Sequence, residues 1–74
     1  MFDIINLMKK KFGENLRRIR KELGLTQMDL AKALNIGLST VNNWEWGYST
    51  PHFETLVKLK QILKCTYEEL IDGE

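Results

Sequence analysis

The sequence predicts an all-α domain of about five helices. Apolar residues recur three or four positions apart along most of the 74 residues, and no segment shows the alternation of a β-strand. Residues that cap or stop helices fall between these stretches, namely Gly24, Thr26, Asn35, Gly47 and Thr66. One small core shared by several short helices explains this pattern.

The first helix is expected over Phe12–Leu23, ended by Gly24. Upstream, residues 1–11 have two interpretations. Ile5 and Met8 continue the apolar stripe of the helix, which favours a helical extension, whereas Gly13 weakens its continuity, which favours a flexible arm. We therefore expect a domain over residues 12–74, preceded by an N-terminal extension or arm at residues 1–11.

Two short helices are expected in the middle of the chain. Thr26 and Asp29 form a weak capping box for the first, and Asn35 ends it in a left-handed conformation. The second, Leu38–Trp46, has few inward positions, so it presents mainly small polar side chains to solvent. Its inward pair is Val41 and Trp44.

A fourth helix is expected to carry Pro51 in its first turn, and a capping box of Thr66 and Glu69 opens a last turn or two that buries Leu70. Cys65 is expected to be a small core residue. The other residues expected in the core are Leu16, Ile19, Leu30, Ala31, Leu34, Val41, Trp44, Leu56, Leu59 and Leu63.

Composition narrows the function classes. One cysteine and one histidine, Cys65 and His52, exclude an internal disulfide and a zinc site, and we expect no metal or cofactor. No run approaches the roughly eighteen apolar residues of a membrane span, and the N-terminus has the wrong charge order for a signal peptide. We therefore expect a cytoplasmic protein. Glu45 has no second catalytic group placed beside it by local spacing, so we do not expect an enzyme.

Charge is unevenly distributed, although eleven Lys and Arg against ten Asp and Glu leave a net +1. Bases crowd the first third of the chain: Lys9, Lys10, Lys11, Arg17, Arg18, Arg20 and Lys21. Acids dominate the end: Glu68, Glu69, Asp72 and Glu74. The basic segment is either a surface that approaches phosphates or only a solvated helix face.

The string LRRIRKELGLTQMDLAKALNIGLSTVNNWEWG, followed by a proline and a helix ending LKCTYEELIDG, resembles the Cro and phage-repressor type of helix-turn-helix domain, the XRE family. The resemblance covers about residues 12–73. It implies a compact five-helix, lambda-repressor-like fold whose third helix enters the DNA major groove. Members usually bind DNA as homodimers, which implies a near-palindromic operator. The C-terminal helix region is the dimer surface that the family suggests, with Ile4–Met8 as the second choice.

The resemblance also implies roles for individual residues. Gln27 matches a glutamine that contacts a DNA phosphate and braces the recognition helix, and Arg20 and Glu45 match a structural salt bridge. Asn43 is the best base reader, because an amide bonds adenine N6 and N7 together. The residues expected to read bases are Leu38, Ser39, Asn42 and Asn43. Those expected at phosphates are Gln27, Thr26, Thr40, Trp46 and Tyr48.

Trp46 departs from the family pattern, and Tyr48 follows two residues on. Exposed aromatic residues here suit either DNA or a protein partner. We therefore expect a sequence-specific double-stranded DNA-binding transcriptional regulator without a small-molecule effector, most simply a small repressor or controller protein. The alternative is a protein-interaction module on the same scaffold, such as an antitoxin or anti-repressor partner.

Overall fold

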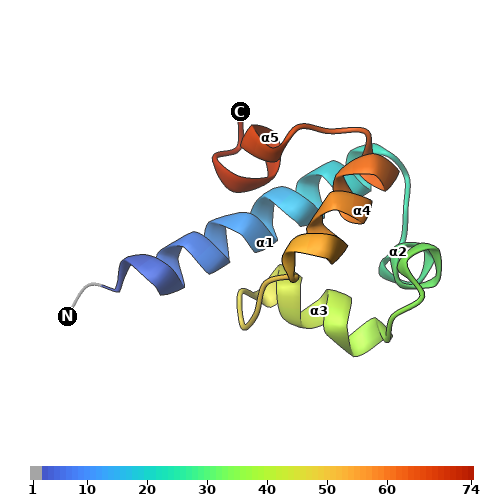
Figure 1. The fold of residues 1–74 in the computed structure, drawn as a ribbon, viewed down its shortest axis with the longest axis horizontal. Helices are drawn as coiled ribbons and strands as arrows, with labels where there is room; N and C mark the ends of the chain where they lie inside the picture. The colour runs from blue at the N-terminus through green and yellow to red at the C-terminus, as the bar shows by residue number, and fades with distance from the viewer. Residues whose placement is uncertain (1–2) are drawn as a thin grey trace.

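The computed structural model describes residues 3–74, and over these residues it contains helices and no strand, so the predicted fold class is confirmed. The helices are α1 (Ile4–Glu22), α2 (Gln27–Leu34), α3 (Leu38–Trp46), α4 (Phe53–Leu63) and α5 (Tyr67–Ile71). Helix α1 runs along the molecule and packs against α3 and α5, while α2 packs against α3 and α4 (Figure 1). Residues 1 and 2 of the expected N-terminal segment lie outside the described range. No helix within residues 3–74 has the length and apolar character needed to cross a bilayer.

The core joins all five of these helices and their connections. Its buried apolar residues are Phe12, Leu16, Ile19, Leu30, Ala31, Leu34, Val41, Trp44, Leu59, Leu63, Cys65 and Leu70. The prediction that Leu56 lies inside the core is wrong, because this residue is only half-buried and lines an open apolar groove at the edge of the core. Burial raises the pKa of the Cys65 thiol, as expected for a small core residue.

Helix α1 begins at Ile4 and not at Phe12. Asp3 caps its start: Oδ1 accepts the backbone N–H of Ile5 at 3.0 Å and that of Asn6 at 3.4 Å. The side-chain amide of Asn6 donates to Asp3 Oδ2 at 2.9 Å. The helix continues without a break through the buried Gly13, so residues 4–11 are a helical extension and not a flexible arm.

Two glycines allow α1 and α3 to approach closely. A Cβ on Gly13 would lie 2.6 Å from the carbonyl oxygen of Glu45, which no side chain tolerates. Gly47 ends α3 with a φ of 83°, and a Cβ there would lie 2.9 Å from Cα of Lys10. The close approach of α3 therefore requires a glycine at position 13, whereas the sequence alone indicates only that Gly13 weakens the continuity of α1.

The connections around α2 and α3 follow the predicted turn chemistry. Thr26 Oγ1 accepts the N–H of Asp29 at 3.0 Å, and Asp29 Oδ2 accepts that of Thr26 at 2.9 Å, which confirms the capping box. The hydrogen bonds from Thr26 lower the pKa of the Asp29 carboxyl. Asn35 ends α2 in the left-handed conformation with a φ of 56°.

Pro51 is placed differently from the prediction. Helix α4 begins at Phe53, with His52 as its N-cap, so Pro51 lies in the connection and not in the first helical turn. The fixed φ of proline fits an extended connection as well as a first turn, so the residue type alone does not distinguish them.

The short helix α5 is held by a cap and by one buried amide. Thr66 and Glu69 form the predicted capping box, and Leu70 is fully buried. Asn15, which is 4% exposed, donates its side-chain N–H to the carbonyl oxygen of Leu70 at 2.8 Å. Asn15 could not be found from local spacing, because its partner on α5, Leu70, lies 55 positions away.

Replacing Gly13 by Ala tests the close packing of α1 and α3. In a free helix this change stabilises by about 1 kcal/mol, but here the added Cβ meets the backbone of α3. We expect the free energy of unfolding in urea to fall by about 1–3 kcal/mol. The control is Glu14→Ala at the exposed neighbouring position, expected to stay within about 0.5 kcal/mol. A more stable Gly13→Ala protein would show that the two helices lie farther apart.

Candidate nucleic-acid interface

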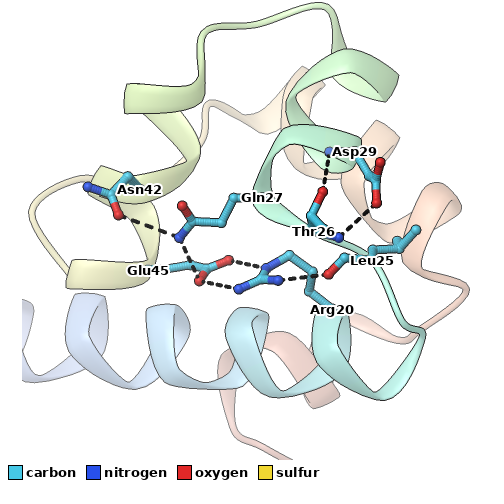
Figure 2. A network of polar contacts seen from close by, with 7 residues as sticks. All are labelled: Arg20, Leu25, Thr26, Gln27, Asp29, Asn42 and Glu45. Carbon is cyan, nitrogen blue, oxygen red and sulfur yellow. Dashed lines mark hydrogen bonds and ion pairs between the residues drawn. The ribbon is translucent and has the colours of Figure 1, made fainter.

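A buried ion pair between Arg20 of α1 and Glu45 of α3 lies at the centre of the candidate site (Figure 2). Arg20 Nε donates to Glu45 Oε2 at 2.6 Å and Nη2 donates to Oε1 at 2.9 Å, while Nη1 donates to the carbonyl oxygen of Leu25 at 2.7 Å. Only 7% and 4% of the two side chains are exposed. The hydrogen bonds to Glu45 raise the pKa of Arg20, so the guanidinium stays charged in spite of its burial.

Gln27, the first residue of α2, joins the same network. Its side-chain Nε2 donates to Glu45 Oε1 at 3.1 Å and makes a longer contact of 3.5 Å with Asn42 Oδ1 (Figure 2). Gln27 thus connects the start of α2 to α3, as the family resemblance implies. The first backbone N–H groups of α2 have no partner within the helix, so they add donors and a partial positive charge beside the Gln27 amide.

The outward face of α3 is polar and accessible. Ser39, Asn42 and Asn43 are exposed, Leu38 is 42% exposed, and Thr40 is half-buried instead of fully outward. Within residues 3–74, the Asn43 side chain makes no hydrogen bond, so both groups of its amide are available to a ligand. The inward Val41 and Trp44 are buried, as predicted.

A polar groove of about 380 Å³ is lined by residues of α1, the start of α2 and α3. It is lined by Lys10, Glu14, Arg17, Arg20, Gln27, Asn42, Glu45 and Trp46. Arg20 and Glu45 neutralise each other, so Lys10 and Arg17 against Glu14 leave one positive charge at its rim. From the sequence alone, the basic residues of α1 could not be divided between this groove and other surfaces. The structure places Arg17 in this groove, whereas Arg18 pairs with Glu22 and Asn15 on α1 itself.

Trp46 and Tyr48 form an exposed aromatic pair at the end of α3. Their ring centroids are 6.5 Å apart, with an angle of 15° between the planes, so the rings stack. Trp46 is 66% exposed and Tyr48 is 72% exposed. Trp46 also lines the polar groove, which places this pair beside Lys10 and the outward face of α3.

Two helices joined by a tight turn, the second with a free polar face, define a helix-turn-helix protein. Residues 16–70 match the helix-turn-helix family model. Because this match spans most of the chain, the chain belongs to the helix-turn-helix family.

The chain is 40% identical over 62 residues to the HTH-type transcriptional regulator DicA of Escherichia coli (strain K12), which covers 84% of this chain and 46% of DicA. It is 31% identical over 62 residues to Repressor protein C2 of Salmonella phage P22, covering 84% of this chain and 29% of that protein. It is 33% identical over 64 residues to the uncharacterized HTH-type transcriptional regulator y4dJ of Sinorhizobium fredii (strain NBRC 101917 / NGR234), covering 86% of this chain and 83% of that protein. The chain thus spans less than half of DicA. No solved structure matches it.

Replacing Glu45 by Ala tests how much the free energy of unfolding depends on pairing the buried Arg20 charge. The change leaves the Arg20 guanidinium without its carboxylate, so the free energy of unfolding should fall by about 3 kcal/mol or more. The double variant Arg20→Met/Glu45→Leu should recover most of this loss, because no buried charge remains. Chemical denaturation measures both. The matched control is Glu22→Ala, which breaks the exposed pair with Arg18 and should cost less than about 1 kcal/mol. Equal losses at Glu45 and Glu22 would contradict the burial.

Proposed function

We propose that this protein is a sequence-specific double-stranded DNA-binding transcriptional regulator, most simply a small repressor or controller protein. The observation that carries the proposal is the exposed polar face of α3, held by the buried Arg20–Glu45 pair and by Gln27. A rigid helix with free amides suits readout in the major groove, where base edges are distinguishable. The names of the relatives DicA and Repressor protein C2 support this assignment.

In this proposal residues of α3 read base edges and their neighbours bind phosphates. Asn43 is the main reader, with Leu38, Ser39 and Asn42 beside it. Gln27 binds a phosphate by exchanging its long 3.5 Å contact with Asn42 for a phosphate oxygen, while it keeps its bond to Glu45. This exchange also frees the Asn42 amide to read a base. Thr26, Thr40, Trp46 and Tyr48 contact the backbone around this centre.

Lys10 and Arg17 extend the phosphate-binding surface along α1. Both line the polar groove together with Gln27 and Trp46. The only opposing exposed charge in that groove, among the described residues, is Glu14. We infer no catalytic role for the site, since the Glu45 carboxylate is engaged by both Arg20 and Gln27.

We further propose a cytoplasmic homodimer that binds a near-palindromic operator without a small-molecule effector. A single recognition helix reads only a few base pairs, so two copies are needed for specificity, with half-site centres roughly 34 Å apart. Residues 12–74 form the DNA-binding domain and residues 1–11 its extension. The alternative is a protein-interaction module, favoured by the exposed Trp46–Tyr48 stack.

A salt titration of binding to random-sequence duplex DNA separates these two functions. The slope of log affinity against log salt counts the phosphates neutralised, so Arg17→Ala should reduce it by about one unit. The control Arg18→Ala removes the same charge from another face of α1 and should leave the slope near that of the unchanged protein. If the unchanged protein forms no complex with DNA at any salt concentration, the alternative function is favoured.

Two substitutions test the separate roles of Asn43 and Gln27 on an operator selected from random duplexes. Asn43→Ala should cost roughly 1–3 kcal/mol on that operator and relax preference at one position in each half-site, because a bidentate base contact is lost. Gln27→Ala should weaken specific and random binding by similar factors, since a phosphate contact carries no sequence information. Competition binding against every single-base variant of the operator measures the base preference of each protein variant. Circular dichroism shows whether each variant keeps its helices. Unchanged preference in Asn43→Ala would move base reading to Ser39 and Asn42.

A further inference from the structure

An apolar groove of about 310 Å³ lies on a different side of α1 from the polar groove. On α1 its wall is made by Ile5, Met8 and Phe12, and the helical period places these well round the helix from Lys10 and Arg17. Its other walls come from Pro51, Leu56 and Ile71. The two grooves therefore present different surfaces, one polar and one apolar, on the same helix.

The N-terminal extension of α1, residues 4–11, begins with a well-formed helix cap, although few other residues pack against it. Asp3 caps it with two backbone hydrogen bonds, yet Ile5 is 60% exposed and Met8 is 56% exposed. The extension projects beyond α3 and α5 (Figure 1), and it lies upstream of the segment that matches the family. Two exposed helical turns gain little stability alone, so their apolar side indicates a binding partner.

The charges around the groove are complementary between copies of this chain. Lys9 lines the groove and Lys11 lies on the same extension, whereas α5 and the residues after it carry Glu68, Asp72 and Glu74. Within residues 3–74, neither of these two bases forms an ion pair with these acids. In a two-fold symmetric contact each basic extension meets the acidic end of the other copy, so the same surface is complementary to itself.

We propose that the apolar groove is the dimer interface, in which the α1 extension of one copy packs into the groove of a second copy of this chain. The two extensions lie with their apolar sides together, and each covers the groove wall that contains Ile71. This interface would be the contact surface of the homodimer in the proposed function. It rests on that function for the number of copies, whereas the surface itself is inferred from the groove and its charges.

Sedimentation of the whole chain without DNA, over about 1 µM to 1 mM, tests the interface. The unchanged protein should show a concentration-dependent monomer–dimer equilibrium. Ile5→Asp on the extension and Ile71→Asp on the groove wall should each raise the dimer dissociation constant roughly tenfold or more, because a symmetric interface loses each apolar contact twice. The control is Leu7→Asp, on an exposed residue of the same extension that does not line the groove.

Three outcomes would overturn this interface: a chain that stays monomeric at about 1 mM, a dimer that Ile5→Asp and Ile71→Asp leave unchanged, or a dimer that Leu7→Asp weakens equally. Circular dichroism shows that each variant keeps its helices. Binding to random duplex DNA, measured on the same samples, separates this inference from the proposed function. A monomer that still binds DNA refutes the interface and the homodimer but leaves DNA binding standing, whereas a dimer that binds no DNA at any salt concentration refutes DNA binding and leaves the interface standing.

Discussion

The buried pair of Arg20 and Glu45 is the interaction on which the arrangement of the helices depends. It joins α1 to α3, and through Leu25 and Gln27 it also holds the connection before α2 and the start of α2. Removing two charges from water offsets much of their attraction, so the pair adds little net stability. Its main effect is geometric, because two parallel hydrogen bonds fix the angle between a guanidinium and a carboxylate.

The apolar core alone would leave that geometry loosely defined. Helix α3 contributes only Val41 and Trp44 to the buried cluster, and two side chains on one face permit the helix to slide or rotate. Gly13 and Gly47 bring the backbones of α1 and α3 close together, and at that distance Arg20 reaches Glu45 directly. Close packing and the ion pair therefore act together to hold the polar face of α3 outward.

Helix caps and turns could be predicted from the spacing of neighbouring residues, whereas contacts between distant helices could not be predicted from spacing. The capping boxes at Thr26 and Thr66 and the left-handed Asn35 depend on neighbouring residues, so spacing reveals them. The start of α1 stayed open between a helical extension and an arm, because glycine is a poor helix former and the packing of Gly13 against α3 does not show in the spacing of residues. At the site, periodicity predicted the outward side chains of α3, and the resemblance implied Arg20 with Glu45. Separating Arg17 from Arg18 needed side-chain positions, because adjacent residues on a helix face different neighbours.

Because α1 is one continuous helix, it couples the two proposed surfaces. Near Lys10 its backbone touches Gly47 at the end of α3, while Met8 lines the apolar groove only two positions earlier. A partner that packs on the extension thereby sets the position of α3 through a short and rigid path. The spacing of two recognition helices then depends on the angle at which two α1 helices meet. A helical extension fixes that angle, which a flexible arm of the same length would leave free, so under the proposed function and interface the capped start at Asp3 affects both the spacing of the two recognition helices and association.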